Sequence, residues 1–174
     1  MDKQLSQGRC SVNSIWEWEH VRDGKVIDTW TERNVCTDEG LNALLDIMFH
    51  AATQLTTWYV LIFETDTTPD ADTTYAVPVW TECTAYDEAT REEYVEAAAS
   101  GKSMTNAASK ASFTMNATKT IYGAALVGGG TDANTKGDAA GGGVIYCASQ
   151  FSSSKPVVST DVLNVTVTLT AADV

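Results

Sequence analysis

The sequence predicts a mainly β protein, a β-sandwich or jelly roll with one α-helix at about residues 38–50. Three observations predict this class. Apolar and polar side chains alternate with a period of two over residues 12–20, as they do in a β-strand. The second half of the chain holds four short segments rich in β-forming residues, separated by turn residues. Only one segment has apolar residues at helical spacing, which is too few helices for an α/β fold.

The length of 174 residues is typical of one domain that buries its own core. Residues 1–9 are polar and without pattern, so we expect a flexible N-terminal arm there. Residues 10–174 are expected to form a single β-sandwich domain, because no internal repeat and no second domain are indicated.

The first two strands are predicted to form a hairpin. Four side chains share one parity of the first strand: Val12, Trp16, Trp18 and His20. Glu17 and Glu19 have the other parity, so the indoles and the carboxylates lie on opposite faces of a sheet. Asp23 and Gly24 both tolerate positive φ and predict the turn. The return strand, residues 25–35, carries Trp30.

A helical pattern follows the hairpin. Thr37 is a good N-cap, and Asp38 and Glu39 place two carboxylates in the first turn, near the positive end of the helix dipole. Four apolar residues then follow at helical spacing: Leu41, Leu44, Leu45 and Met48. We expect this apolar stripe to cover an open end or face of a sheet.

The remaining elements are predicted as strands and loops. Residues 57–63 are apolar on both parities, which predicts a strand buried on both faces. Residues 64–79 contain two prolines among aspartate and threonine and predict a loop. Segments 80–86 and 91–98 are expected to be short and extended, although the glutamate and alanine of the second also allow a helix. Four further strands are predicted at residues 110–116, 120–127, 143–151 and 162–170.

Composition excludes several function classes. The net charge of −12 disfavours nucleic acid as a partner, since an acidic surface repels phosphates. The longest apolar run is far shorter than the ~20 residues that span a membrane, so no membrane partner is expected. The N-terminus lacks the apolar segment of a signal peptide, which predicts synthesis in a reducing cytoplasm.

No pattern of catalytic or metal-binding residues is found. Four cysteines lie tens of residues apart, without a zinc-site spacing, and are expected to be free thiols, although their even number permits two disulfides: Cys10, Cys36, Cys83 and Cys147. His20 and His50 lack the sequence context of a catalytic base. Residues 132–143 depart from a calcium loop at Lys136 and Gly143. We therefore expect no enzyme activity, no cofactor and no metal.

The three tryptophans of the first hairpin are the candidate interface residues. Trp16, Trp18 and Trp30 lie close together on the predicted hairpin, and tryptophan is enriched at the centres of protein interfaces. The alternative is that these indoles pack under the helix as core. The sequence leaves both alternatives open.

The order of several segments resembles a known group of proteins. The segments are Asn34-Val35-Cys36-Thr37-Asp38-Glu39-Gly40-Leu41-Asn42-Ala43-Leu44-Leu45-Asp46, then Trp58-Tyr59-Val60-Leu61-Ile62, Thr84-Ala85-Tyr86-Asp87-Glu88-Ala89-Thr90-Arg91, Ser109-Lys110-Ala111-Ser112-Phe113, and Ile121-Tyr122-Gly123-Ala124-Ala125-Leu126. This series is similar to small virion structural proteins of tailed bacteriophages, of the capsid cement or decoration type. The resemblance covers roughly residues 34–170. It implies a β-sandwich or jelly roll that binds the outside of an icosahedral shell. No functional residue can be transferred from it to this sequence.

Two functions are compatible with these observations. The first is a capsid cement protein on the exterior of the virion, made in the host cytoplasm, which stabilises the shell by bridging major capsid proteins and acts as a homo-oligomer. The second is a phage tail or fibre module that recognises a host surface glycan, because aromatic platforms beside carboxylates suit sugars and jelly rolls host lectin sites.

Overall fold

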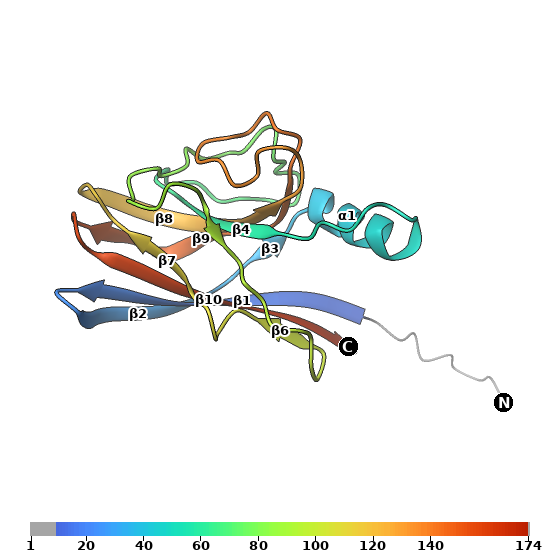
Figure 1. Ribbon diagram of the computed structural model, residues 1–174, viewed down its shortest axis with the longest axis horizontal. Helices are drawn as coiled ribbons and strands as arrows, with labels where there is room; N and C mark the ends of the chain where they lie inside the picture. Colours follow the sequence, from blue (N-terminus) through green and yellow to red (C-terminus); the bar gives the residue numbers. More distant parts are fainter. Residues whose placement is uncertain (1–9, 174) are drawn as a thin grey trace.

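The computed structural model describes residues 10–173 and consists of two antiparallel β-sheets packed face to face, with one α-helix at one end (Figure 1). Strands contain 49% of the residues, which confirms the predicted mainly β class, a β-sandwich with one helix. The predicted arm, residues 1–9, lies outside the described residues.

The first sheet joins the two ends of the described chain. Its strands are β1 (Cys10–Arg22), β2 (Lys25–Arg33), β6 (Ser103–Thr105), β7 (Ala111–Thr114) and β10 (Val162–Asp173). The order is β2-β1-β10-β6, and β7 pairs with the first part of β10. β1 pairs with β10 along nearly its whole length, from Cys10 opposite Asp173 to Val21 opposite Val162. The predicted hairpin between β1 and β2 is confirmed.

The second sheet has the order β3-β9-β8-β4-β5. Its strands are β3 (Val35–Cys36), β4 (Trp58–Phe63), β5 (Glu92–Glu93), β8 (Lys119–Gly128) and β9 (Val144–Val157). β9 is longer than predicted because residues 152–157, expected to be part of a loop, continue the strand, and residues 155–157 pair with the start of β8. The helical alternative for residues 91–98 is wrong, since this segment contains only the short strand β5 and irregular backbone. Strand β6 was not predicted.

Two hydrophobic clusters explain why β4 is apolar on both parities. Val60 and Ile62 belong to the cluster between the two sheets. Leu61 and Phe63 belong to a second cluster on the outer face of the second sheet. Long loops cover that outer face (Figure 1), and one of them contributes Trp80, whose ring stacks on Phe63. The predicted strand buried on both faces is therefore confirmed.

The helix α1 (Asp38–Phe49) matches the predicted helix closely. It leaves the end of the sandwich and points away from both sheets (Figure 1). None of the helices in the described residues has the length and apolarity needed to cross a membrane.

Candidate protein-interaction surface

Helix α1 is attached to the sandwich by its first turn. The Thr37 hydroxyl caps the helix, accepting from the Gly40 N–H at 3.0 Å, and it also donates to the Ile145 carbonyl on β9. One carboxylate oxygen of Glu39 accepts from the Ile145 N–H at 2.8 Å and from the Tyr75 N–H at 3.0 Å. These hydrogen bonds pair the free backbone groups at the start of the helix and on β9, and they fix the residue at which the helix begins.

Gly40 allows the first turn to lie directly against β9. A Cβ atom at this position would be 2.6 Å from the Tyr146 Cα and backbone oxygen, closer than any real side chain can approach. Gly40 is also the only buried residue within residues 38–49. The backbone of the first turn therefore packs on the sheet, and the later turns do not.

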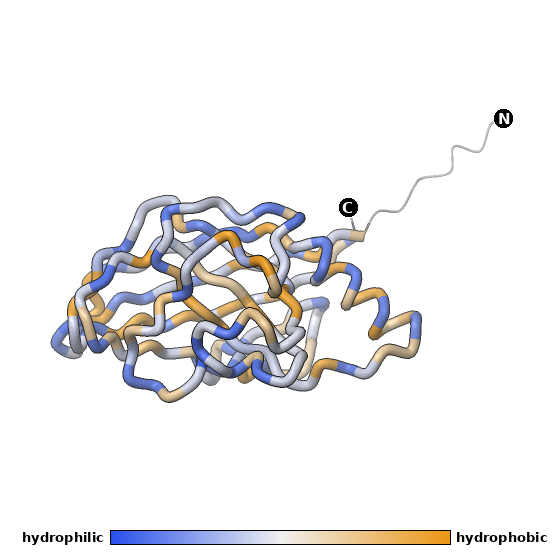
Figure 2. Tube along the Cα trace, turned by 90° about the horizontal axis from the view of Figure 1, so that it is seen from above, coloured by the Kyte–Doolittle hydropathy of each residue, from blue (hydrophilic) through white to orange (hydrophobic). Residues whose placement is uncertain are grey.

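The later turns of α1 expose a continuous set of apolar side chains. These are Leu41, Leu44, Leu45, Met48 and Phe49, with exposed fractions of 36%, 38%, 55%, 66% and 80%. We call these five residues the α1 surface. The stripe was expected to cover an open end or face of a sheet. It lies over no sheet face, because the helix contacts the sandwich at its base and extends beyond the sheet edge (Figures 1 and 2), and only Leu44 and Met48 of these five line a pocket at the end of the sandwich. Clustered exposed apolar side chains are typical of a binding surface.

An apolar pocket of about 360 Å³ continues the α1 surface towards the sandwich. Side chains from the helix and from both sheets line it: Leu44, Met48, Trp58, Met104, Tyr146 and Leu169. The pocket reaches both sheets because α1 only partly closes the end of the sandwich. The helix and the pocket together form one apolar region with a convex part and a concave part.

Acidic groups border this apolar region. Asp38 and Asp46 are exposed on α1, and Glu96 is an exposed residue that lines the pocket. The last turn of the helix carries no basic residue. An apolar partner surface with basic residues at its edge would complement this region, since opposite charges at the rim favour encounter and register.

The structure places the candidate tryptophans of the first hairpin in or against the core. Trp16 and Trp18 are each 1% exposed and belong to the cluster between the sheets. Trp30 is half-buried, with the Trp18 ring stacked on it at 5.6 Å and the Lys155 ammonium over it at 4.2 Å. Burial supports the core alternative for Trp16 and Trp18, but these indoles pack between the two sheets and not under the helix, as that alternative had it. Trp16 and Trp18 have no surface to offer a partner, because β1 turns this parity inward.

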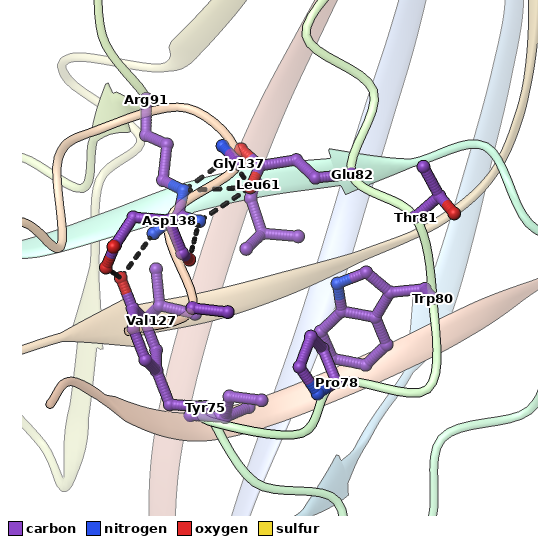
Figure 3. Close-up of a pocket in the computed structure, with 12 residues that line it drawn as sticks. Leu61, Tyr75, Pro78, Trp80, Thr81, Glu82, Arg91, Val127, Gly137 and Asp138 are labelled. Carbon is purple, nitrogen blue, oxygen red and sulfur yellow. Dashed lines mark hydrogen bonds and ion pairs between the residues drawn. The ribbon is translucent and has the colours of Figure 1, made fainter. Parts of the chain in front are cut away.

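A second feature is a half-open pocket of about 290 Å³ over the outer face of the second sheet (Figure 3). Arg91, which is 2% exposed, lies in it and binds both carboxylate oxygens of Glu82, at 2.6 to 3.2 Å. Its remaining N–H groups donate to the Tyr75 hydroxyl at 2.8 Å and to the carbonyls of Ala133 and Asp138 at 3.0 and 2.7 Å.

This pocket is a structural junction. A guanidinium has five N–H donors, and those of Arg91 are all used within the chain, so none is left for a ligand. Burial is the main reason why the pKa of the Tyr75 hydroxyl is raised to about 12, so this group stays protonated and donates to Asp138 at 2.8 Å. Arg91 thus ties the glycine-rich loop after β8 to the sheet.

The two histidines have structural surroundings. His20 is buried, and its Nε2 lies 2.8 Å from the Asp161 carboxylate, which also receives two bonds from Arg22 at 2.7 Å. The Arg22 guanidinium is the main reason why the pKa of the Asp161 carboxyl lies well below its usual value. His50 ends α1. Within residues 10–173, no group of three or more histidine, cysteine or acidic side chains is arranged to hold a metal ion.

The chain matches no protein-family model and no curated protein. The fold and the site define a β-sandwich that presents an apolar helix at one end.

Sequence reasoning found most residues of the α1 surface but gave them the wrong role. Phe49, the most exposed of them, was not included in the stripe. Phe49 directly follows Met48, so it makes the apolar face of the helix broader than a single sheet edge covers. That breadth was the signal in the sequence that part of the stripe stays exposed. Arg91 was missed because no local pattern marks a buried arginine.

Proposed function

We propose that this chain is a capsid decoration protein of a tailed bacteriophage, which binds the outer shell through the α1 surface and the adjoining pocket. The observation that carries the proposal is the α1 surface itself: five apolar side chains exposed on a helix whose base is fixed to a rigid β-sandwich. The order of segments over residues 34–170, which resembles small virion structural proteins of cement type, supplies the identity of the partner, the major capsid protein.

The proposed mechanism is stabilisation by binding. A protein that binds the assembled shell and not its separate subunits shifts the equilibrium towards the shell by mass action. The apolar region supplies the burial, and its acidic border suits a capsid surface with basic residues. We further propose that copies of the chain associate with each other, because an oligomer that spans several capsid subunits gains avidity from many weak contacts.

Co-sedimentation with empty shells tests this proposal. The shells are assembled from the major capsid protein of a tailed bacteriophage, and the test variant is Met48→Ser/Phe49→Ser. These side chains are 66% and 80% exposed, so their burial in an interface contributes about 2–4 kcal/mol, and the variant should bind roughly 30- to 1,000-fold more weakly. Its unfolding free energy should change little, because neither side chain is in the core.

The matched control is Val26→Thr/Ile27→Thr on β2. These residues are 55% and 50% exposed and follow the turn between β1 and β2. That turn lies at the end of the molecule opposite to α1 (Figure 1). The control should bind shells as the unchanged chain does. Equal binding by the α1 variant would remove α1 as the interface, and failure of the unchanged chain to bind any shell would refute the decoration function. Sedimentation velocity of the isolated chain measures self-association.

The glycan-binding alternative gains no support from the structure. It relied on exposed aromatic platforms, and all five tryptophans lie in the described part of the chain, where none is exposed. Trp16, Trp18 and Trp80 are buried, and Trp30 and Trp58 are half-buried.

A further inference from the structure

Cys36 and Cys147 lie opposite each other on neighbouring antiparallel strands. The register of β3 and β9 pairs Cys36 with Cys147. The Thr37 N–H donates to the Tyr146 carbonyl at 3.2 Å, and this bond joins the residue after Cys36 to the residue before Cys147. The two cysteines therefore form a non-hydrogen-bonded pair, the type in which the Cα atoms are closest, about 4.5 Å apart.

This geometry is compatible with a disulfide. Disulfides span Cα separations of roughly 4.4–6.8 Å, so the pair needs no large backbone movement. Both side chains also point to the same side of the sheet: Cys147 belongs to the cluster between the sheets, and Cys36 packs against that cluster. Cys147 is 0% exposed, whereas Cys36 is half-buried, so a reagent in solution reaches Cys36 first.

We propose that Cys36 and Cys147 are a modification site that forms a cross-strand disulfide on exposure to a small-molecule disulfide. In the first step the Cys36 thiolate attacks the reagent, forms a mixed disulfide and releases one small thiol. In the second step the Cys147 thiolate attacks the Cys36 sulfur, forms the Cys36–Cys147 bond and releases the second small thiol. The two protein thiols are oxidised and the reagent is reduced to two thiols, so atoms and electrons balance.

The disulfide would strengthen the attachment of α1. Cys36 is followed directly by Thr37, the N-cap of the helix, so the new bond would hold the base of α1 to β9 covalently. It would also close a loop of about 110 residues, and in the chain-entropy model a loop of this length lowers the unfolding equilibrium constant about a thousandfold or more.

The compartment determines when the disulfide forms. A reducing cytoplasm keeps both thiols free, and the oxidising medium outside the cell favours the bond. This timing rests on the proposed function, because a decoration protein leaves the cytoplasm on the virion. Burial raises the pKa of both thiols, so little thiolate exists at neutral pH, and the reaction should be faster in alkaline solution.

The experiment oxidises the isolated, folded chain with oxidised glutathione. The protein is then alkylated in denaturant, digested without reduction and mapped by mass spectrometry. We expect a peptide pair that joins Cys36 to Cys147. Urea unfolding should show that the oxidised chain has an unfolding equilibrium constant about a thousandfold lower than the reduced chain, and dithiothreitol should reverse this difference.

Two variants separate this disulfide from other thiol chemistry. Cys36→Ser should lose both the cross-linked peptide and the gain in stability. Cys10→Ser, which removes an exposed cysteine at the start of β1, should keep both. A glutathione adduct that persists on Cys36, a link to Cys10 or Cys83, or the absence of any link would overturn the proposal. Because no shell is present, failure of shell binding leaves this result unchanged.

Discussion

The replacement Arg91→Met tests whether the buried Arg91–Glu82 pair holds the outer loops on the second sheet. The side chains of Arg91 and Glu82 are only 1% and 7% exposed. Removing the guanidinium would leave the Glu82 carboxylate buried without its cation, and would leave the Ala133 and Asp138 carbonyls without a donor. Breaking such a buried pair from one side costs about 3–5 kcal/mol. That is a large part of the roughly 5–15 kcal/mol that stabilises an ordinary domain.

The double variant Glu82→Gln/Arg91→Met isolates the charge. The amide keeps an oxygen for the Gly137 N–H, which donates to Glu82 at 2.9 Å, but it brings no unpaired charge into the loop junction. We expect it to be more stable than Arg91→Met by about 2 kcal/mol, because an unpaired buried charge costs more than an unpaired neutral group. Urea unfolding followed by tryptophan fluorescence measures both variants.

Two results would refute this reasoning. A loss below about 1 kcal/mol for Arg91→Met would mean that the pair contributes no more than an exposed ion pair. Equal losses for the single and the double variant would mean that packing and the two carbonyl contacts matter and the buried charge does not. Unchanged urea m-values are required for either comparison, since a changed m-value signals a different unfolded or native state.

Two further predictions concern the core and the end of β1. Trp18→Ala should destabilise the isolated chain by about 3–5 kcal/mol, because this indole is 1% exposed; urea unfolding without any partner checks this, and a stable variant would return Trp18 to the list of interface candidates. The pKa of the Asp161 carboxyl is lowered in the folded state, chiefly by Arg22. The ionised carboxylate therefore stabilises the folded state at pH values above the ordinary aspartate pKa of about 4, and this stabilisation is lost as the pH falls below that value. Asp161→Asn should be less stable by about 2 kcal/mol at neutral pH, and its deficit should shrink in acid; a deficit that does not change with pH would contradict the assignment.

The fold was largely predictable because its signals are local. Alternation with a period of two located β1, and a run apolar on both parities located β4. The turn at Asp23 and Gly24 follows from residues that accept positive φ, with values of 50° and 71°. β9 was underestimated because residues 152–154 are polar and exposed, so this part of the strand has no apolar pattern to mark it.

For β1, the sequence predicts which side chains share a face of the strand but not whether that face is buried. Alternation put Trp16 and Trp18 on one face of a strand, and they do share one face. It could not say whether that face was inside, since the answer depends on the second sheet and on β10, whose residues lie more than 100 positions further along the chain. Arg91 presents the same difficulty, because its partners at Tyr75, Glu82 and Asp138 converge only in the folded chain.

The apolar stripe of helix α1 predicts the helix but not the surface that covers it. An apolar stripe indicates that a helix will be covered, but it does not indicate by what. In this chain Thr37, Glu39 and Gly40 hold the first turn so firmly against β9 that the later turns are directed past the sheet edge. Within residues 10–173 no other element covers Phe49, which is 80% exposed. Under the proposed decoration function, the capsid shell covers this stripe, and the hydrogen bonds at the base of α1 set the orientation in which the stripe is presented.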